Sequence, residues 1–551
     1  MPLLSFLKKS TRSHSTHSHT DLPDDICFSI MAFLDSKDVL SSCILISKQW
    51  QREATNIKLT WIKKRLIKGR DLVKSISESN SKYLNNLTFL SFRYAAPSAK
   101  LDNAGLIELA KCSNLQNLKT LILFCNKIGD EGIEGFTQSD IFQNLTHLDL
   151  YGNYLTDKGV SKLANCKYLS KLTHLDIYNN EFGDEAIRSI ANSPFLSGLT
   201  YLDISKNNVT QAGAKSLSES LYIKNLTELN CYRTFFRTEG LTSLANSENM
   251  SNLTNISLDI NEIGGIGVTA LAHSPYIKNL KTLALYGNNA GDAAIIDLVQ
   301  SPNMSNLRVL DVSKTGISDK AAVEISQSEY LRNLTVLDIS TNNVQKEGFE
   351  RVVSSTILSK VTDLNCSCRY FTAEHANIVF NGLNMKNIKL LNMTLKGVEG
   401  INMISELPYL INIHTLNWSH NFIGDKGCQV LSQSPYLKSI TKIHLGSNHI
   451  GEEGAKALAN SPNFKNLKIL ELTCNNLENS GVQYICKGQY FGKLEELVIA
   501  DNKIGEESII SISRSRSQLF SLKKLDISDN KLSESIVKMA QSIPWLEIVL
   551  V

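Results

Sequence analysis

Residues 145–166 read LTHLDLYGNYLTDKGVSKLANC, and this stretch combines two hydrophobic periods. Leu145, Leu148 and Leu150 take the inward positions of a short strand, so the residues between them face the opposite side. Beyond the strand, apolar residues return every three or four positions behind Asp157, which predicts a capped helix. The stretch therefore predicts one strand followed by one helix.

The strand pattern L-x-x-L-x-L-x-x-N returns along the chain with a period of 27 residues. Two intervals differ, one of 25 before Ile413 and one of 28 before Leu522. Leu87 begins a degenerate unit upstream, and the C-terminal residues 546–551 read as a last strand. The first apolar residues of the sixteen units are Leu118, Leu145, Leu172, Leu199, Leu226, Leu253, Leu280, Leu307, Leu334, Val361, Ile388, Ile413, Ile440, Leu467, Leu494 and Leu522.

One such unit cannot bury its apolar face alone, so neighbouring units must stack. Strands then form a parallel sheet, and because helices pack further apart than strands, the array curves with the sheet on its concave face. The period lies within the range of leucine-rich repeats. Motifs such as NKIGDEG at 126–132 and NHIGEEG at 448–454 resemble the ribonuclease-inhibitor-like and cysteine-containing classes. We expect an α/β horseshoe of about 17 repeats over residues 87–551.

The asparagine that closes each strand pattern predicts an internal ladder. A buried amide can satisfy backbone groups that lose their partners where the chain leaves the strand. The expected members are Asn126, Asn153, Asn180, Asn207, Asn261, Asn288, Asn342, Asn421, Asn448, Asn475, Asn502 and Asn530.

Composition limits the function classes. A net charge of +3 over 551 residues gives no general attraction to nucleic acid or to an anionic membrane. The 11 cysteines are scattered and mostly stand where a small hydrophobe would serve, which favours reduced thiols. The N-terminus has no secretory signal, and no run reaches membrane-spanning length. We therefore expect an intracellular protein, in the cytoplasm or also in the nucleus.

The N-terminal segment reads differently from the repeats. Residues 1–20 form a polar tail with three histidines, for which we expect disorder rather than a metal site. Residues 21–66 read as three short helices, with Pro23 at a helix start and apolar stripes behind it. Residues 67–86 are expected to be a helical linker or cap, since an open solenoid exposes its first apolar layer.

Residues 21–66 resemble the F-box family. The matching features are Leu22-Pro23, Ile26, Ile30, Phe33-Leu34, Asp38-Val39-Leu40, the run from Ser47 to Trp50, Leu59 and Trp61. Asp25 departs from the usual glutamate and Ile46 from the usual valine. The resemblance implies docking of an apolar helix face onto the Skp-type adaptor of a cullin ligase. The implied contact residues are Leu22, Pro23, Ile26, Ile30, Leu34, Val39 and Leu40. A plain cap for the solenoid is the alternative.

No catalytic or cofactor motif appears in the sequence. There is no phosphate-binding glycine loop followed by lysine, no HExxH and no zinc-like cysteine spacing. Cys366 and Cys368 share a predicted strand, and packing is the simpler interpretation of that pair. We therefore expect neither an enzyme nor a bound cofactor.

The outward strand positions carry the candidate target site. Aromatic anchors bury a large area at little entropic cost, which suits protein recognition. The adjacent aspartates Asp149, Asp176, Asp203, Asp311 and Asp338 could flank them or could be stock repeat residues. Two similar units, 230–240 and 365–375, lack the asparagine and add arginine beside aromatics, through drift or for binding. The predicted target-binding residues are Phe124, Tyr151, Tyr178, Tyr232, Arg233, Tyr286, Arg369 and Tyr370.

These features predict a substrate-recognition subunit of an SCF-type (Skp–cullin–F-box) ubiquitin ligase. Its helical segment would bind the adaptor and its concave sheet the target protein. The alternative is a repeat scaffold without an F-box, such as an inhibitor or a regulator of a small GTPase, in which an arginine such as Arg233 could assist GTP hydrolysis.

Overall fold

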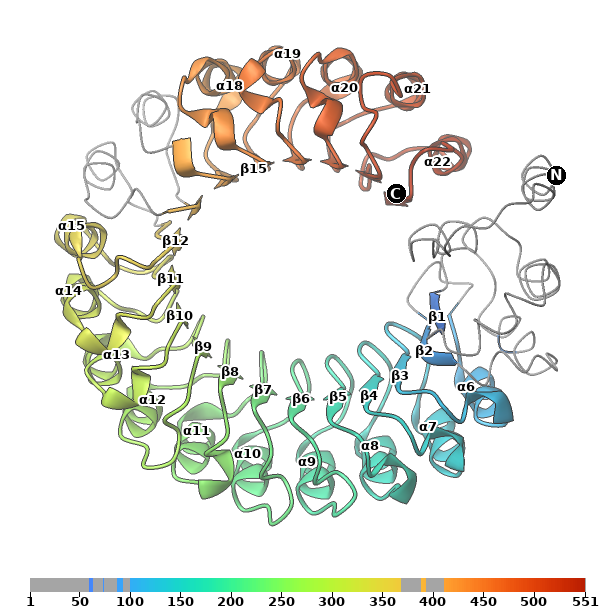
Figure 1. Ribbon diagram of the computed structural model, residues 1–551, viewed down its shortest axis with the longest axis vertical. Coiled ribbons are helices and arrows are strands. Elements are labelled where there is room, and N and C mark those ends of the chain that lie inside the picture. Colours follow the sequence, from blue (N-terminus) through green and yellow to red (C-terminus); the bar gives the residue numbers. More distant parts are fainter. Residues whose placement is uncertain are drawn as a thin grey trace, which may run out of the picture.

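A computed structural model describes residues 59–62, 73, 87–92, 100–367, 388–392 and 411–550. Within these residues, nineteen strands form one parallel sheet, in which each strand pairs with its neighbours in the sequence. The strands line the inner rim of an arc and the helices its outer rim (Figure 1). The predicted α/β solenoid with a concave parallel sheet is confirmed.

The strands are short and regularly spaced. They are β1 (Leu59–Ile62), β2 (Leu87–Ser91), β3 (Thr120–Ile122), β4 (His147–Asp149), β5 (His174–Asp176), β6 (Tyr201–Asp203), β7 (Glu228–Asn230), β8 (Asn255–Ser257), β9 (Thr282–Ala284), β10 (Val309–Asp311), β11 (Val336–Asp338), β12 (Asp363–Asn365), β13 (Leu390–Asn392), β14 (Thr415–Asn417), β15 (Lys442–His444), β16 (Ile469–Glu471), β17 (Glu496–Val498), β18 (Lys524–Asp526) and β19 (Ile548–Leu550).

One α-helix follows most strands. The described α-helices are α6 (Asn103–Leu109), α7 (Asp130–Thr137), α8 (Asp157–Ala164), α9 (Asp184–Ala191), α10 (Gln211–Ser218), α11 (Arg237–Ala245), α12 (Gly265–Ala272), α13 (Gly291–Val299), α14 (Asp319–Gln327), α15 (Lys346–Ser354), α18 (Gly424–Gln433), α19 (Glu452–Ala459), α20 (Glu478–Lys487), α21 (Glu506–Arg514) and α22 (Glu534–Gln541). Short 3-10 helices lead from several of them to the next strand, namely η4 (Ser113–Leu115), η5 (Asp140–Phe142), η6 (Lys167–Leu169), η7 (Glu248–Met250), η8 (Pro302–Met304), η9 (Glu329–Leu331), η12 (Leu437–Ser439), η13 (Pro462–Phe464) and η14 (Phe491–Lys493).

The strand register explains why two irregular repeat intervals are tolerated. Each of the sixteen predicted units supplies one strand, from β3 to β18. The middle leucine still pairs with its equivalent across the 25-residue interval, Leu391 with Leu416, and across the 28-residue interval, Leu497 with Leu525. The change in length is therefore absorbed outside the strands. β2 and β19 confirm the predicted first and last strands.

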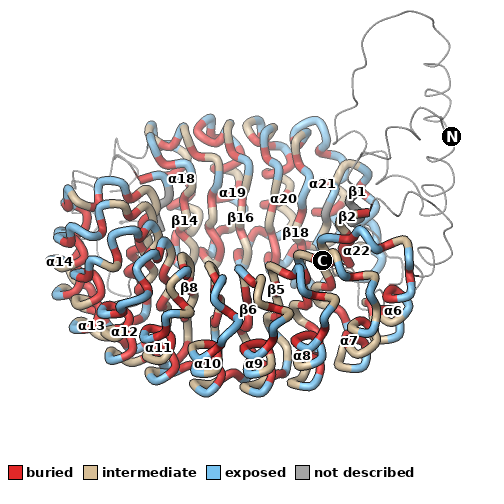
Figure 2. Tube along the Cα trace, turned by 60° about the horizontal axis from the view of Figure 1, so that its bottom comes forward, coloured by how far each residue is buried: buried red, intermediate tan, exposed pale blue. Residues whose placement is uncertain are grey.

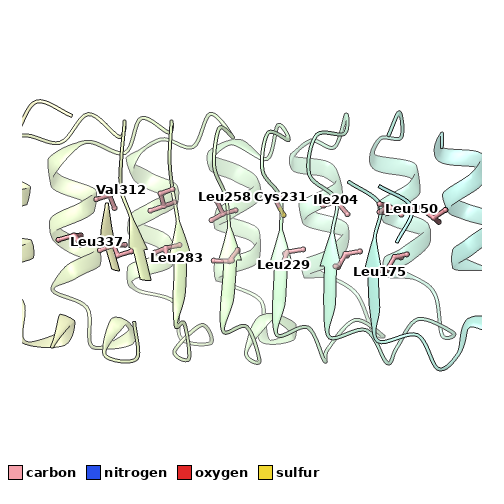
Figure 3. Close-up of a cluster of buried hydrophobic side chains, with 14 of the residues drawn as sticks. Leu150, Leu175, Ile204, Leu229, Cys231, Leu258, Leu283, Val312 and Leu337 are labelled. Carbon is pink, nitrogen blue, oxygen red and sulfur yellow. The ribbon is translucent and has the colours of Figure 1, made fainter. Parts of the chain in front are cut away.

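The core lies between the sheet and the helices. Buried residues form a layer that follows the described part of the arc (Figure 2). Leu229, Cys231 and Leu258 are fully buried, and they point from the strands towards the helices together with their equivalents in neighbouring units (Figure 3). Each unit thus completes the core of the next, as expected for a solenoid.

The N-terminal prediction needs one correction. Residues 59–62, assigned from the sequence to a helical segment, form strand β1, which pairs in parallel with β2. The helical prediction is therefore wrong at these four residues, because they extend the sheet instead. Val73 is helical and buried, as a cap would require. The rest of segments 1–20 and 21–66, including all seven predicted adaptor contacts, lies outside the described residues.

The asparagine ladder is confirmed. Asn153 Nδ2 donates to the carbonyl oxygens of Leu123 in the preceding unit and of Leu150 in its own unit, both at 2.9 Å. Its Oδ1 accepts the backbone N–H of Ile128 at 3.1 Å. The unit that begins at Leu226 lacks the asparagine. There the Thr234 hydroxyl takes this position and donates to the Cys231 carbonyl oxygen at 3.0 Å. That unit therefore keeps the ladder, with the buried Thr234 in place of the asparagine.

A second ladder joins the helix N-termini, and it changes the role predicted for Asp157. The residue that caps α8 is Thr156, while Asp157 caps the next helix. Its Oδ1 accepts the backbone N–H groups of Gly183 at 2.8 Å and Ala186 at 2.9 Å. Asp130, Asp184, Asp292, Asp319 and Asp425 act on the following helix in the same way. Each aspartate thus satisfies donors that a helix start leaves without partners.

Serines form a third ladder at the helix C-termini. The Ser193 hydroxyl donates to the Ala164 carbonyl oxygen at 2.5 Å, and the Ser220 hydroxyl donates to that of Ala191 at 2.5 Å. Cys166 occupies the same position, and its thiol lies 3.3 Å from the Thr137 carbonyl oxygen. The eight cysteines among the described residues are all free thiols.

The aspartate ladder predicts that loss of one aspartate destabilises the following helix. Asp184 Oδ1 accepts the N–H groups of Thr210 at 2.7 Å and Gly213 at 2.9 Å, and Oδ2 accepts the Thr210 hydroxyl at 2.7 Å. We expect Asp184→Ala to lower the free energy of unfolding by about 2–3 kcal/mol and to speed hydrogen exchange at the start of α10. Urea unfolding and hydrogen exchange measure both effects.

Glu185 provides the matched control for this substitution. It lies next to Asp184 on α9, and among the described residues its one ion pair is an exposed one to Arg188. Glu185→Ala should therefore change the free energy of unfolding by less than about 0.5 kcal/mol. An equal loss in both variants would mean that surface charge, and not capping of the next helix, stabilises this edge.

Candidate functional site

The concave face of β3 to β7 carries three parallel rows of polar and aromatic side chains. We call this surface the concave strip. Strand alternation places these residues opposite the buried leucines, so they face the interior of the arc. The strip comprises Phe124, His147, Asp149, Tyr151, His174, Asp176, Tyr178, Tyr201, Asp203, Lys206, Asn230 and Tyr232.

The first row consists of aromatic residues just after the strands. The Phe124 and Tyr151 rings stack with centroids 4.3 Å apart, and Tyr151 and Tyr178 follow at 4.5 Å. Ser205 interrupts the row, so the next ring, Tyr232, lies 6.5 Å from Tyr178 and almost parallel to it. Each of these four rings is partly exposed. The stacking holds large apolar surfaces in fixed orientations, as recognition anchors require.

Lys206 lies against the interrupted part of this row. Its ammonium is 5.3 Å from the Tyr178 ring centroid and 5.7 Å from that of Tyr232. The backbone at Lys206 has a φ of 49° and donates its N–H to the Tyr232 carbonyl oxygen at 2.8 Å. A hydrogen bond to Tyr178 raises the pKa of the lysine. The two rings therefore already bind one cation, which belongs to the chain itself.

A second aromatic row, formed by His147, His174 and Tyr201, lies at the other edge of the strip. It was not predicted from the sequence. The His147 and His174 rings stack at 4.7 Å, and His174 and Tyr201 stack at 3.8 Å. Burial, with a smaller contribution from His147, lowers the pKa of His174 to about 4, so this ring is neutral at pH 7. The sequence did contain a signal for this row, because its three residues directly precede the middle leucine of their units, in HLD, HLD and YLD.

Aspartates lie between the two aromatic rows. Asp149, Asp176 and Asp203 each accept the backbone N–H of the residue two positions on, at 2.9–3.0 Å, which ends the strand. Asp203 also accepts the Asn230 amide at 3.1 Å. These hydrogen bonds give the aspartates a role in the turn, and the same carboxylates still face the concave side.

The middle carboxyl group of the row, that of Asp176, has a raised pKa. Burial, and then the charge of Asp203, raises the pKa of Asp176 to about 7. A similar pair lies further along the arc, where burial and Asp338 raise the pKa of Asp311 to about 6. Negative charge on the concave face thus costs free energy in the folded protein.

This cost predicts that folded stability depends on pH. Since the folded pKa of Asp176 lies above its ordinary value of 3.8, the folded state binds more protons between pH 4 and 7, and stability falls as pH rises through that range. An asparagine at this position would keep the turn hydrogen bond without the charge. We expect Asp176→Asn to add about 1–2 kcal/mol to the free energy of unfolding at pH 8 and nothing at pH 3.

Asp526 offers a matched control for the pH experiment. It makes the same turn, accepting the Ser528 N–H at 3.0 Å, but its register neighbours are Val498 and Leu550. Asp526→Asn therefore removes a turn carboxylate that has no aspartate beside it in the register, and comparison with Asp176→Asn isolates the effect of the aspartate row. Chemical unfolding of the three proteins from pH 3 to pH 8 makes the comparison, and parallel curves for wild type and Asp176→Asn would refute the explanation.

The structure brings together only some of the predicted target-binding residues. Tyr286 continues the first row but is separated from Tyr232 by Asp259, and the Lys314 ammonium lies 5.9 Å from its ring. Arg233 is exposed beside Tyr232, and its side chain has no bonded partner among the described residues. Arg369 and Tyr370 lie outside the described residues.

The described residues contain no group of three or more His, Cys, Asp or Glu side chains arranged to hold a metal ion. The same part of the chain contains no helix long and apolar enough to cross a bilayer. What the strip offers chemically is noncovalent binding through aromatic faces and carboxylates.

Comparison with known proteins identifies the repeats. The family model described as Leucine Rich repeat matches residues 114–136, 143–164, 168–191, 198–218, 303–326, 330–351, 436–459 and 465–486. A second model, Leucine Rich Repeat, matches residues 521–542. The chain therefore contains leucine-rich repeats. These matches begin at residue 114, so none of them includes residues 21–66. A search of the curated proteins finds no match.

The solved structures that match this chain share little sequence with it. The ectodomain of the plant membrane receptor kinase GASSHO1/SCHENGEN3 from Arabidopsis thaliana is 18% identical over 85% of this chain and 56% of its own, with a TM-score of 0.36. The plant peptide hormone receptor RGFR1 is 17% identical over 85% and 74%, with a TM-score of 0.32. An internalin from Listeria monocytogenes is 16% identical over 81% and 93%, with a TM-score of 0.24.

Proposed function

We propose that this leucine-rich-repeat scaffold recruits a target protein to an SCF-type ubiquitin ligase, with the concave strip as its recognition surface. The proposal has two parts, recognition of the target and binding to the ligase. Recognition is supported by the row of partly exposed rings from Phe124 to Tyr232 on the sheet. Buried aromatic anchors supply much of the binding energy in protein interfaces. The chain itself would perform no bond chemistry.

The ligase half rests on residues 21–66, which resemble an F-box. An apolar helix face built from Leu22, Ile26 and Ile30 suits a groove on a Skp-type adaptor. A rigid solenoid between the two contacts would hold the target near a ubiquitin-loaded enzyme and raise its effective concentration there.

A pull-down with purified Skp adaptor tests the ligase half. We expect the full chain to retain the adaptor, and the variant Ile26→Asp/Ile30→Asp to lose it, because a charge in an apolar groove is left unpaired. Substitutions in the concave strip, such as Tyr178→Ala, should leave adaptor binding unchanged. Retention that survives deletion of residues 21–58 would contradict the assignment.

The second candidate is a repeat scaffold that regulates a small GTPase. Arg233 favours it, because its guanidinium is exposed and has no partner among the described residues, as an arginine that acts on a bound nucleotide would need to be. GTP turnover by candidate GTPases separates the two functions. Acceleration that is lost in Arg233→Lys would support the regulator, and unchanged turnover would remove it.

A further inference from the structure

Two carboxylates of the concave strip, Asp176 and Asp203, have no cationic partner among the described residues. Asp176 and Asp203 receive hydrogen bonds only from neutral groups, and no lysine or arginine among the described residues forms an ion pair with either. Burial, and then the neighbouring charge of Asp203, raises the pKa of Asp176, so negative charge in this row raises the free energy of the folded protein. A ligand that brings positive charge to this row would relieve that cost.

The aromatic rows point to the same kind of ligand. Tyrosine faces attract ammonium and guanidinium groups, and the attraction strengthens when carboxylates lie nearby. Lys206 demonstrates this within the chain, because its ammonium lies within 6 Å of the centroids of both Tyr178 and Tyr232. The position exists because the small Ser205 leaves a gap in the row.

The length of the strip favours a polypeptide. Five strands, β3 to β7, at a spacing of about 4.8 Å make a surface about 19 Å long, which matches roughly six residues of extended chain. A single amino acid or small amine would cover only one or two of the rings. The first aromatic row runs from β3 to β7 and the other from β4 to β6, so together they offer a ring at each of the five strands.

We propose that the concave strip binds an extended polypeptide segment carrying lysine or arginine side chains, and that Lys206 competes with one of them for the Tyr178–Tyr232 ring pair. This inference rests on the proposed role of the strip as the recognition surface, and it names the chemistry of the partner. When the segment binds, one of its cations displaces the Lys206 ammonium from the rings, and others lie over the aspartate row.

Fluorescence anisotropy with the full chain tests the proposal. The probe is a labelled eight-residue peptide of alternating lysine and serine, and the control peptide has glutamine in place of lysine. We expect the lysine peptide to bind at least tenfold more tightly than the control. The variant Tyr178→Ala/Tyr232→Ala should weaken binding of the lysine peptide about tenfold.

Lys206 gives the discriminating variant. Lys206→Gln removes the internal competitor while keeping a side chain of similar length, so affinity for the lysine peptide should rise about fivefold. Lys206→Arg keeps a cation and should behave as wild type. Lys215→Gln removes the same charge from α10 on the outer rim, where Lys215 pairs with Glu219, and should change affinity less than twofold.

Several results would overturn the inference. Equal binding of the glutamine peptide would exclude cation recognition, and unchanged or weaker binding by Lys206→Gln would exclude competition. Tighter binding of spermine than of the peptide would assign the strip to a polyamine instead of a polypeptide. If a target protein crosslinks to the strip but ignores the Lys206 and tyrosine substitutions, this inference fails while the proposed function stands.

Discussion

Asn475→Ala is expected to lower the free energy of unfolding by about 3–5 kcal/mol, one of the largest effects available to a single substitution in this chain. Asn475 is 4% exposed. Its Oδ1 accepts the backbone N–H groups of Asn448 at 3.0 Å and Ile450 at 2.9 Å. Its Nδ2 donates to the carbonyl oxygens of Leu445 at 3.0 Å and Leu472 at 2.9 Å. Alanine would leave three of these backbone groups buried without a partner among the described residues, while the Leu472 carbonyl oxygen would keep its second hydrogen bond, from Asn502 Nδ2 at 2.8 Å.

The neighbouring Asn476 makes a stringent control. It is exposed, and within the described part of the chain its side chain accepts a single surface hydrogen bond, from Lys503 at 3.1 Å. Asn476→Ala should cost less than about 0.5 kcal/mol. Because repeat arrays can unfold in parts, hydrogen exchange of β15 to β17 should be followed beside urea unfolding. Equal stability of the two variants would show that the ladder contributes no net stability.

Tyr151→Ala/Tyr178→Ala is expected to weaken binding of the target protein by about 100-fold, which corresponds to about 2.7 kcal/mol. The two rings lie in the middle of the stacked row, 4.5 Å apart, so their loss removes the central anchors and leaves Phe124 without a stacking partner. Isothermal titration calorimetry with the purified target measures the change.

Tyr330→Ala controls for the loss of an exposed aromatic residue. Tyr330 belongs to η9, away from the concave strip, and is 37% exposed. Both variants should unfold within about 1 kcal/mol of wild type, since none of these rings belongs to the buried core. A change in target affinity below threefold for the double variant would place recognition elsewhere on the arc.

The repeat period made most of the fold predictable from the sequence. Apolar residues at Leu145, Leu148 and Leu150, repeated every 27 residues, determine both the strand and the stacking. The asparagine ladder could be predicted because a buried amide must bond locally. The role of Asp157 could not be predicted, because its partners Gly183 and Ala186 lie 26 and 29 residues further on, in another unit.

The candidate site was predictable only in part, for a similar reason. The first aromatic row follows from strand alternation, since Tyr151 and Tyr178 stand at equivalent positions. The position of Lys206 does not, because it depends on the gap at Ser205 and on a positive φ after the strand. The row of His147, His174 and Tyr201 was visible in the sequence but resembled ordinary repeat residues.

Site-specific photocrosslinking tests most directly whether the concave strip is the recognition surface. A photoreactive phenylalanine analogue is introduced at Tyr151, on the strip, or at Ile266, which is 76% exposed on α12 at the outer rim. We predict that position 151 yields a covalent adduct with one target protein, that Lys206 and Tyr232 variants alter its yield, and that position 266 yields none. An adduct with the same target from position 266 and not from position 151 would contradict the account.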